Sequence, residues 1–335
     1  MKAYIAMTRG EVFDTFFPPE NIKLAESLGE IVWHDGENAP TKEEAKKALA
    51  DCDVYITSWG SPKLDEELLA AAPHLKLHSH LCGSVAPYAD PVVWEKGIRV
   101  LSGNRYFAES VAEGALAYML TALRDIPYFS KRLKNERIWK ADHSYNEGLA
   151  GKKIGIISYG AIAKNVVRVL SVFRTELYVY DIKPLPQEDV EKYGLKQASL
   201  EQIFSECDII TAHTPLFDAT YHMIGKELLS RIKPGALLVN TSRGAIFDQA
   251  ALEEELTDGR FRAILDVFEQ EPPPADCKLF DLPNVIMMPH MAGPTVDLRK
   301  VIAHDLLLES AAFMEHGGDL PDEITREMAA VMSVV

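Results

Sequence analysis

The fold is decided by two neighbouring stretches, Gly151-Lys-Lys-Ile-Gly-Ile-Ile-Ser-Tyr-Gly-Ala-Ile-Ala-Lys164 and Glu176-Leu-Tyr-Val-Tyr-Asp181. A short apolar run that ends at Ile157 predicts a buried strand, and the apolar rhythm of residues 161–173 predicts a helix after a tight turn. A second apolar strand ends in Asp181. Strand, turn, helix, strand and terminal acid are typical of the first βαβ unit of a dinucleotide-binding sheet.

The glycine pattern of that turn is incomplete. The three glycine positions of Gly-x-Gly-x-x-Gly fall on Ser158, Gly160 and Ala163, so only the middle glycine is present. A phosphate would lie on the helix N-terminus, where free N–H groups and the helix dipole favour an anion. Asp181 would accept hydrogen bonds from a ribose diol and repel a 2′-phosphate, which indicates NAD. A plain βαβ unit of any α/β fold is the alternative, because parallel strands are commonly joined this way.

Length and charge narrow the class of protein. The chain has 335 residues, which predicts about two domains, and its formal net charge is −15. An acidic chain without a basic run is not expected to bind nucleic acid or an anionic membrane surface. We find no run of about 20 apolar residues that would span a membrane, and no signal-peptide pattern. The four scattered cysteines predict reduced thiols in a cytoplasmic protein, without a CxxC metal site.

Strand and helix signals alternate along most of the chain, which predicts parallel sheets covered on both faces. The first 103 residues predict a small doubly wound domain, and residues 104–124 predict one long helix. The second half predicts six strands. We expect Trp139 to pack a polar loop onto the body of the protein. Predicted strands in the first domain are 3–7, 31–34, 54–57, 75–78 and 98–101, and a loop of small residues, Ser79–Val85, follows the fourth.

Three predicted strand ends in the second half carry unusual polar side chains. Arg243 follows one strand, Asp266 and Glu271 follow the next, and His290 follows the last. In a parallel sheet these ends converge, and a guanidinium, a carboxylate and an imidazole there suit a 2-keto or 2-hydroxy acid. Arginine binds a carboxylate bidentately, and histidine is the natural acid or base near neutral pH. A carboxylate behind the histidine orients the ring and favours its charged form.

Each of these residues also has a purely structural interpretation. Arg243 could cap carbonyl groups at the surface, Glu271 could be a solvated loop charge, and His290 could be a satisfied strand-end histidine. Asp266 could cap a turn. The repetition of the pattern at successive strand ends favours the functional interpretation.

Several blocks of this sequence resemble the D-isomer-specific 2-hydroxyacid dehydrogenases. Three of them resemble that family's signature blocks, and further similarity extends the resemblance over about residues 75–310. The three blocks are Thr241-Ser-Arg-Gly-Ala-Ile-Phe-Asp248, Ile264-Leu-Asp-Val-Phe-Glu-Gln-Glu-Pro-Pro273 and Met288-Pro-His-Met-Ala-Gly-Pro294.

The resemblance implies a role for each matching residue. His290 resembles the proton donor to the carbonyl group, Glu271 its carboxylate partner, and Arg243 the group that holds the substrate carboxylate. Cys82, Gly83 and Ser84 fall on the family's substrate loop, although two of its glycines are replaced. The residues implied to contact NAD are Gly160, Ala161, Ile162, Asp181, Thr214, Pro215, Thr241 and Asp266.

We therefore predict two doubly wound α/β domains, a Rossmann NAD domain inserted in a flavodoxin-like substrate domain. Residues 1–103 and 295–335 are the predicted substrate domain, and residues 104–294 the NAD domain. The predicted activity is hydride transfer between NAD(H) and a D-2-hydroxy acid or 2-keto acid, and the resemblance implies a homodimer. The alternatives are an NADH-sensing regulatory protein of the same fold and a formate- or phosphite-type oxidoreductase. Because Ala161 replaces the usual arginine and Ser158 a glycine, we expect weaker NADH binding than a full fingerprint gives.

Overall fold

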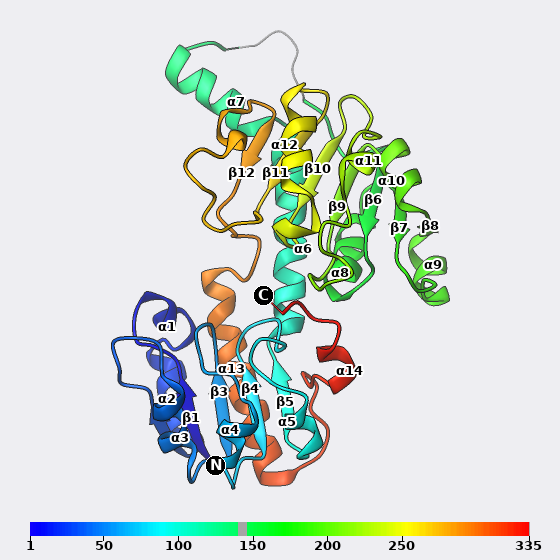
Figure 1. Ribbon diagram of the computed structural model, residues 1–335. Coiled ribbons are helices and arrows are strands. Elements are labelled where there is room, and N and C mark those ends of the chain that lie inside the picture. The colour runs from blue at the N-terminus through cyan, green and yellow to red at the C-terminus, as the bar shows by residue number, and fades with distance from the viewer. Residues whose placement is uncertain (140–145, 335) are drawn as a thin grey trace. The chain divides into compact units, whose positions relative to one another are not determined.

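The computed structural model describes residues 1–139 and 146–334, and within them the chain forms two compact units (Figure 1). One unit combines Met1–Phe107 with Pro294–Val335, and the other is Ala108–Gly293. Each unit contains its own parallel sheet with helices on both faces. This architecture confirms the predicted fold class, in which one α/β unit is inserted in the chain of the other.

The first unit has a five-stranded sheet in the order β2-β1-β3-β4-β5. One core cluster lies on each face of this sheet. Thr41 and Asp65 are the N-caps of two helices in this unit, and each side chain accepts a hydrogen bond from a backbone amide of its helix. The strands are β1 (Lys2–Ala6), β2 (Glu30–Trp33), β3 (Val54–Thr57), β4 (Leu77–His80) and β5 (Arg99–Ser102). The helices are α1 (Glu11–Phe16), α2 (Pro19–Leu28) and α13 (Val296–His316) on one face, α3 (Lys42–Leu49), α4 (Glu66–Ala70) and α5 (Val92–Glu95) on the other, and α14 (Arg326–Ala329).

Strand β4 lies two residues later in the chain than predicted. The strand was predicted over residues 75–78, but it includes His80, and both His78 and His80 are fully buried. The hydroxyl of Thr57 on β3 lies 2.8 Å from Nε2 of His78 and 2.9 Å from Nδ1 of His80. Burial lowers the pKa of His78 to about 3 and also lowers the pKa of His80. The two rings are therefore neutral polar members of the core.

The second unit has a seven-stranded parallel sheet within the described residues, in the order β12-β11-β10-β9-β6-β7-β8. The prediction of six strands was wrong by one, because β8 contains only two exposed residues and carries no apolar run. The strands are β6 (Lys153–Ile157), β7 (Glu176–Tyr180), β8 (Lys196–Gln197), β9 (Ile209–Ala212), β10 (Leu237–Asn240), β11 (Arg262–Leu265) and β12 (Val285–Met287).

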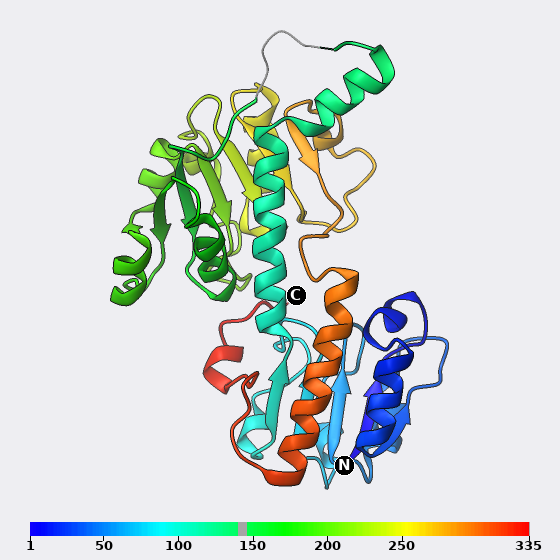
Figure 2. The same cartoon turned by 180° about the vertical axis from the view of Figure 1, so that it is seen from behind.

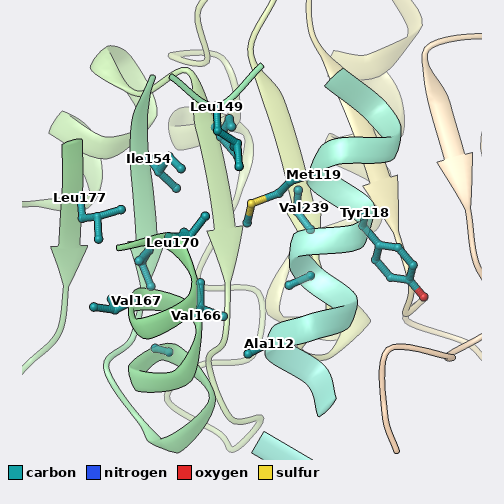
Figure 3. Packing of buried hydrophobic residues seen from close by; sticks show 14 of the residues in the cluster. Ala112, Tyr118, Met119, Leu149, Ile154, Val166, Val167, Leu170, Leu177 and Val239 are labelled. Atoms are coloured by element: carbon teal, nitrogen blue, oxygen red, sulfur yellow. The ribbon is translucent and has the colours of Figure 1, made fainter. Parts of the chain in front are cut away.

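Helices cover both faces of this second sheet. Figure 3 shows Met119 of α6 and Val166 of α8 packing with β-strand residues on one face. The long helix α6 was predicted and is present. The helices are α6 (Asn104–Leu123), α8 (Ala161–Leu170) and α9 (Gln187–Tyr193) on that face, α10 (Leu200–Glu206), α11 (Lys226–Leu229) and α12 (Gln249–Thr257) on the other, with the short turns η2 (Gly244–Ile246) and η3 (Lys278–Asp281).

Helix α7 (Ile126–Lys131) and the π-helical turn η1 (Arg132–Glu136) extend away from the sheet of this unit (Figure 1). Trp139 follows them and is 79% exposed, so the expectation that it packs onto the body was wrong. The apolar side chains of Ile126 and Leu133 on the same segment are also exposed. Among the described residues, no helix is both long enough and apolar enough to cross a membrane.

In the turn between β6 and α8, Ser158 takes the place of the first fingerprint glycine. Ser158 has φ 72°, in the left-handed region that favours glycine. Its amide donates to the carbonyl of Tyr180 at 2.8 Å, and its hydroxyl lies 2.9 Å from the hydroxyl of Thr214. These two hydrogen bonds hold the serine in a conformation that an L-residue disfavours.

Two substitutions of Ser158 separate the backbone cost from the side-chain hydrogen bond. Both Ser158→Gly and Ser158→Ala lose the bond to Thr214, but only glycine removes the cost of the left-handed conformation. We expect the glycine variant to have the larger free energy of unfolding, by about 1 kcal/mol. Urea denaturation of both variants measures the difference, and equal stabilities would show that the backbone conformation costs nothing.

Candidate active site

Three loops leave the second sheet at the carboxyl ends of β10, β11 and β12. These strands are parallel neighbours, and Asn240 at the end of β10 pairs with Leu265 at the end of β11. The loops that follow carry Arg243, Glu271 and His290. The described structure thus brings these three side chains to one edge of one sheet, as the sequence predicted.

His290 and Glu271 form a hydrogen-bonded pair. Nδ1 of His290 lies 2.7 Å from Oε2 of Glu271, and the other carboxylate oxygen accepts the amide of Phe268 at 3.0 Å. Because Nδ1 faces a carboxylate, it carries the hydrogen, and Nε2 becomes the atom that can exchange a proton with a ligand. About half of the imidazole side chain, 48%, is exposed, so Nε2 can be reached from solvent.

The environment keeps Glu271 ionised. Burial alone would raise the pKa of Glu271, but the hydrogen bonds from His290 and Phe268 and the nearby positive charges lower that pKa below its ordinary value. One of these charges is Arg243. An ionised carboxylate at this position orients the imidazole ring through the hydrogen bond at Nδ1.

Arg243 lies on a loop whose backbone packs tightly against the loop of Glu271. A side chain at Gly244 would place its Cβ 1.9 Å from the carbonyl carbon of Phe268, so only glycine allows this approach. One guanidinium nitrogen of Arg243 donates to the Ser242 carbonyl at 2.8 Å. Burial lowers the pKa of Arg243, and the charge of Glu271 opposes that shift. The guanidinium stays charged, since an ordinary arginine pKa lies far above neutral pH.

Asp266 is buried, with 1% of its surface exposed, and its carboxylate accepts three hydrogen bonds from the protein. The donors are the hydroxyl of Tyr118 at 2.9 Å and the amides of Met291 at 2.7 Å and Ala292 at 2.9 Å. The carboxylate therefore holds the chain next to His290. Its contact with a nicotinamide carboxamide stays a prediction.

The start of α8 has the features that a pyrophosphate needs. The helix begins at Ala161, and no side chain within the described residues caps its free amides. A Cβ at Gly160 would meet nothing within 4 Å, so the backbone is open to a close ligand. Ala161 is exposed there and Ile162 is half-buried. Free N–H groups at an open helix end favour an anion.

Asp181 stands after β7, where a ribose binder is expected. Its carboxylate accepts the amide of Tyr159 at 2.7 Å and the amide of Lys183 at 2.8 Å. Carboxylate oxygens have about four acceptor positions, so two remain for ribose hydroxyls. The same hydrogen bonds tie the end of β7 to the turn that precedes α8.

Two threonines lie at the ends of neighbouring strands. Thr214 is buried after β9 beside the half-buried Pro215, and its hydroxyl contacts the hydroxyl of Ser158. Thr241 follows β10, and within the described residues its buried hydroxyl has no hydrogen-bond partner. A buried polar atom without a partner is costly unless a ligand or water supplies one. This orphaned hydroxyl fits the predicted cofactor contact.

Cys82, Gly83 and Ser84 lie in the first unit, directly after β4. The Cys82 thiol is buried in the core, and burial raises its pKa. The Ser84 hydroxyl donates to the Ser333 carbonyl at 2.6 Å. The substrate contacts of Cys82, Gly83 and Ser84 stay a prediction.

Sequence reasoning missed Tyr118, which is bonded to Asp266 from α6. A signal was present, because Tyr118 places a hydroxyl within the apolar run of residues 115–120, eight residues after Ser110. Eight residues are close to two helical turns, so both side chains lie on one face.

Comparison with known proteins identifies the family of this chain. Residues 116–292 match the family described as D-isomer specific 2-hydroxyacid dehydrogenase, NAD binding domain. A glyoxylate reductase of Korarchaeum cryptofilum is 31% identical over 314 residues, covering 92% of this chain and 93% of that protein. A D-3-phosphoglycerate dehydrogenase of Methanocaldococcus jannaschii is 34% identical over 281 residues, covering 83% of this chain and 52% of that protein. This chain thus spans about half the length of the second relative.

Solved structures of related proteins have the same fold. A phosphoglycerate oxidoreductase from Rhizobium etli superposes with a TM-score of 0.78 at 27% identity, covering 97% of this chain and 98% of that one. These similarities confirm the predicted family, enzyme class and nicotinamide cofactor. The chain therefore belongs to the D-isomer-specific 2-hydroxyacid dehydrogenases and is an NAD-dependent oxidoreductase.

Proposed function

We propose that this enzyme interconverts a 2-keto acid and the corresponding D-2-hydroxy acid, with His290 as the proton donor in the reducing direction. The observation that carries this proposal is the 2.7 Å hydrogen bond between His290 and the ionised Glu271, at the sheet edge that also presents Arg243. An acid and a carboxylate-binding group are the two functions that reduction of a keto acid needs.

Each of the three residues has a separate role in the reaction. Arg243 binds the substrate carboxylate and polarises the keto oxygen, which orients the carbonyl carbon. The chemistry that NADH would supply when bound is the hydride that reduces this carbon. Nε2 of His290 gives its proton to the developing alkoxide, and Glu271 stabilises the imidazolium before the transfer. In the oxidising direction His290 takes the hydroxyl proton.

The cofactor would be held by the groups that the sequence assigned to it. The open helix end at Gly160–Ile162 would bind the pyrophosphate, and Asp181 would bind the ribose and disfavour a 2′-phosphate. Thr214, Pro215 and Thr241 would line the nicotinamide side, and Asp266 would contact the carboxamide. The orphaned hydroxyl of Thr241 supports this assignment from the structure itself.

The two units would have the roles that the sequence assigned. Residues 104–294 would bind NAD, and residues 1–103 with 295–335 would bind the rest of the substrate through the backbone near Gly83. Small residues in this loop would let a small acid approach the backbone closely.

We also infer a cytoplasmic homodimer. The four cysteines are free and buried, as expected of a reducing compartment. The exposed apolar side chains of Ile126, Leu133 and Trp139 suit a subunit interface. Sedimentation equilibrium should give twice the mass of one chain, and a monomer at micromolar concentration would contradict this inference.

His290→Ala tests the proton donor. Loss of a general acid should lower kcat for reduction of 2-keto acids by about 10²–10⁴-fold. NADH affinity, measured by fluorescence titration, should change little, because the imidazole acts on the substrate.

His222→Ala is the matched control for that variant. His222 has φ 50°, and its Nε2 lies 3.0 Å from Glu269, so it shares with His290 a left-handed backbone conformation and a glutamate partner in the same unit. The control should keep its kcat. Normal turnover by His290→Ala would exclude this histidine as the donor. NADH binding by wild-type protein without turnover on a panel of 2-keto acids would favour the regulatory alternative.

Arg243→Ala tests the carboxylate site. Removing a bidentate charge-assisted contact should raise KM for the keto acid at least tenfold, with a smaller fall in kcat. Arg243→Lys keeps the charge but loses the planar fork, so its KM should be intermediate. Steady-state kinetics with varied keto acid measure both, and an unchanged KM in the alanine variant would place the substrate carboxylate elsewhere.

A further inference from the structure

One residue holds three successive backbone amides around His290. The carbonyl of Asp266 accepts the amide of His290 at 2.8 Å. Its carboxylate accepts the next two amides, Met291 on Oδ1 at 2.7 Å and Ala292 on Oδ2 at 2.9 Å. Since Asp266 directly follows β11, these bonds fix the His290 segment to the sheet.

The segment needs to be held, because His290 adopts a left-handed conformation with φ 53°. This region is disfavoured for residues other than glycine, by about 1–2 kcal/mol. A residue in such a conformation persists only where its surroundings impose it. Without the hydrogen bonds to Asp266, the backbone of His290 would relax from this conformation, and its ring would move away from Glu271.

The fourth donor to Asp266 comes from helix α6. The hydroxyl of Tyr118 donates to Oδ1 at 2.9 Å, and both residues are buried. Burial and the charge of Asp266 raise the pKa of Tyr118, so its hydroxyl keeps its proton and donates. In Figure 3 Tyr118 points away from the side of the helix on which Met119 packs with the core. The ring of Tyr118 belongs to the same buried apolar cluster, and its hydroxyl reaches Asp266.

Two more residues of the same helix face contact the His290 segment. Ser110 donates from its hydroxyl to the carbonyl of Gly293 at 3.1 Å. Gly114 lies so close that a Cβ would fall 3.0 Å from Cα of Ala292. Ser110, Gly114 and Tyr118 are four residues apart in turn, which places them in one row along the helix.

We propose that the row Ser110–Gly114–Tyr118 on α6 positions His290, and that Tyr118 does so through the carboxylate of Asp266. These residues do not touch the reacting atoms. They keep the backbone of His290 in its left-handed conformation. In this conformation Nδ1 of the imidazole meets Glu271, and about half of the side chain is exposed to solvent. The proposal rests on the assignment of His290 as proton donor, but it makes a separate structural claim about the ring.

Tyr118→Phe removes one hydroxyl and keeps the ring that fills the space. Loss of one hydrogen bond to a buried carboxylate should loosen the His290 segment, and kcat should fall about tenfold. KM for NADH and for the keto acid should stay within about twofold, because no binding group is removed.

Tyr106→Phe is the matched control. Tyr106 is also buried and donates its hydroxyl to an aspartate, Asp305, at 2.6 Å, but it lies in the first unit. It should lose a similar amount of stability in urea denaturation and keep its kcat. An equal fall of kcat in both variants would show a general effect of stability and would overturn the proposal.

The second readout does not depend on turnover. The hydrogen between Nδ1 of His290 and Glu271 should give a proton resonance far downfield, assigned by its loss in His290→Ala. In cofactor-free Tyr118→Phe this resonance should broaden or disappear through exchange, and in Tyr106→Phe it should remain. An unchanged resonance and an unchanged kcat in Tyr118→Phe would refute the positioning role, whatever His290 does in catalysis.

Gly114→Ala provides an independent test through packing. The added methyl group must displace Ala292, so the resonance should shift and kcat should fall, although alanine favours the helix by about 1 kcal/mol. A stable Gly114→Ala protein with wild-type kcat and an unmoved resonance would show that the helix face does not control the ring. If His290→Ala remains active while the Tyr118→Phe resonance changes as expected, the positioning claim stands and the proton-donor assignment fails.

Discussion

The carboxylate of Asp266 is the constraint on which the candidate site of the second unit depends. A buried carboxylate is costly unless donors surround it, and this one has Tyr118 and two backbone amides. The carboxylate and its donors stabilise each other. The donors stabilise the buried charge, and the charge fixes the chain that carries His290. This arrangement is attached to the sheet, because Asp266 is the first residue after β11.

Close backbone approaches complete the site where side chains would not fit. Gly244 lets the Arg243 loop lie directly on Phe268 and Glu269, and the nearest backbone atoms leave no room for a Cβ. Gly114 lets helix α6 lie close to Ala292, where a Cβ would fall 3.0 Å from the nearest atom. The positions of the loops that carry Arg243 and His290 are therefore set largely by backbone packing, which deforms little.

The sequence predicted what depends on local pattern. Alternating strand and helix signals predicted two parallel sheets, and polar residues after three strands predicted the cluster of Arg243, Glu271 and His290. What depends on tertiary packing was missed or misplaced. Strand β4 was shifted because the polar His80 does not look like a core residue, yet Thr57 satisfies it inside the fold. The partnership of Tyr118 with Asp266 joins residues 148 positions apart, which periodicity cannot reveal.

The turn before α8 illustrates how such packing can replace a residue that the sequence pattern requires. Glycine would adopt the left-handed conformation of Ser158 without strain, whereas serine needs bonds that offset the cost. Those bonds come from the two strands beside it, through the Tyr180 carbonyl and the Thr214 hydroxyl. Asp181 adds a third by accepting the amide of Tyr159. The incomplete fingerprint thus keeps the shape of the turn and the open helix end, and it differs from a full one mainly in the charge that Ala161 does not supply.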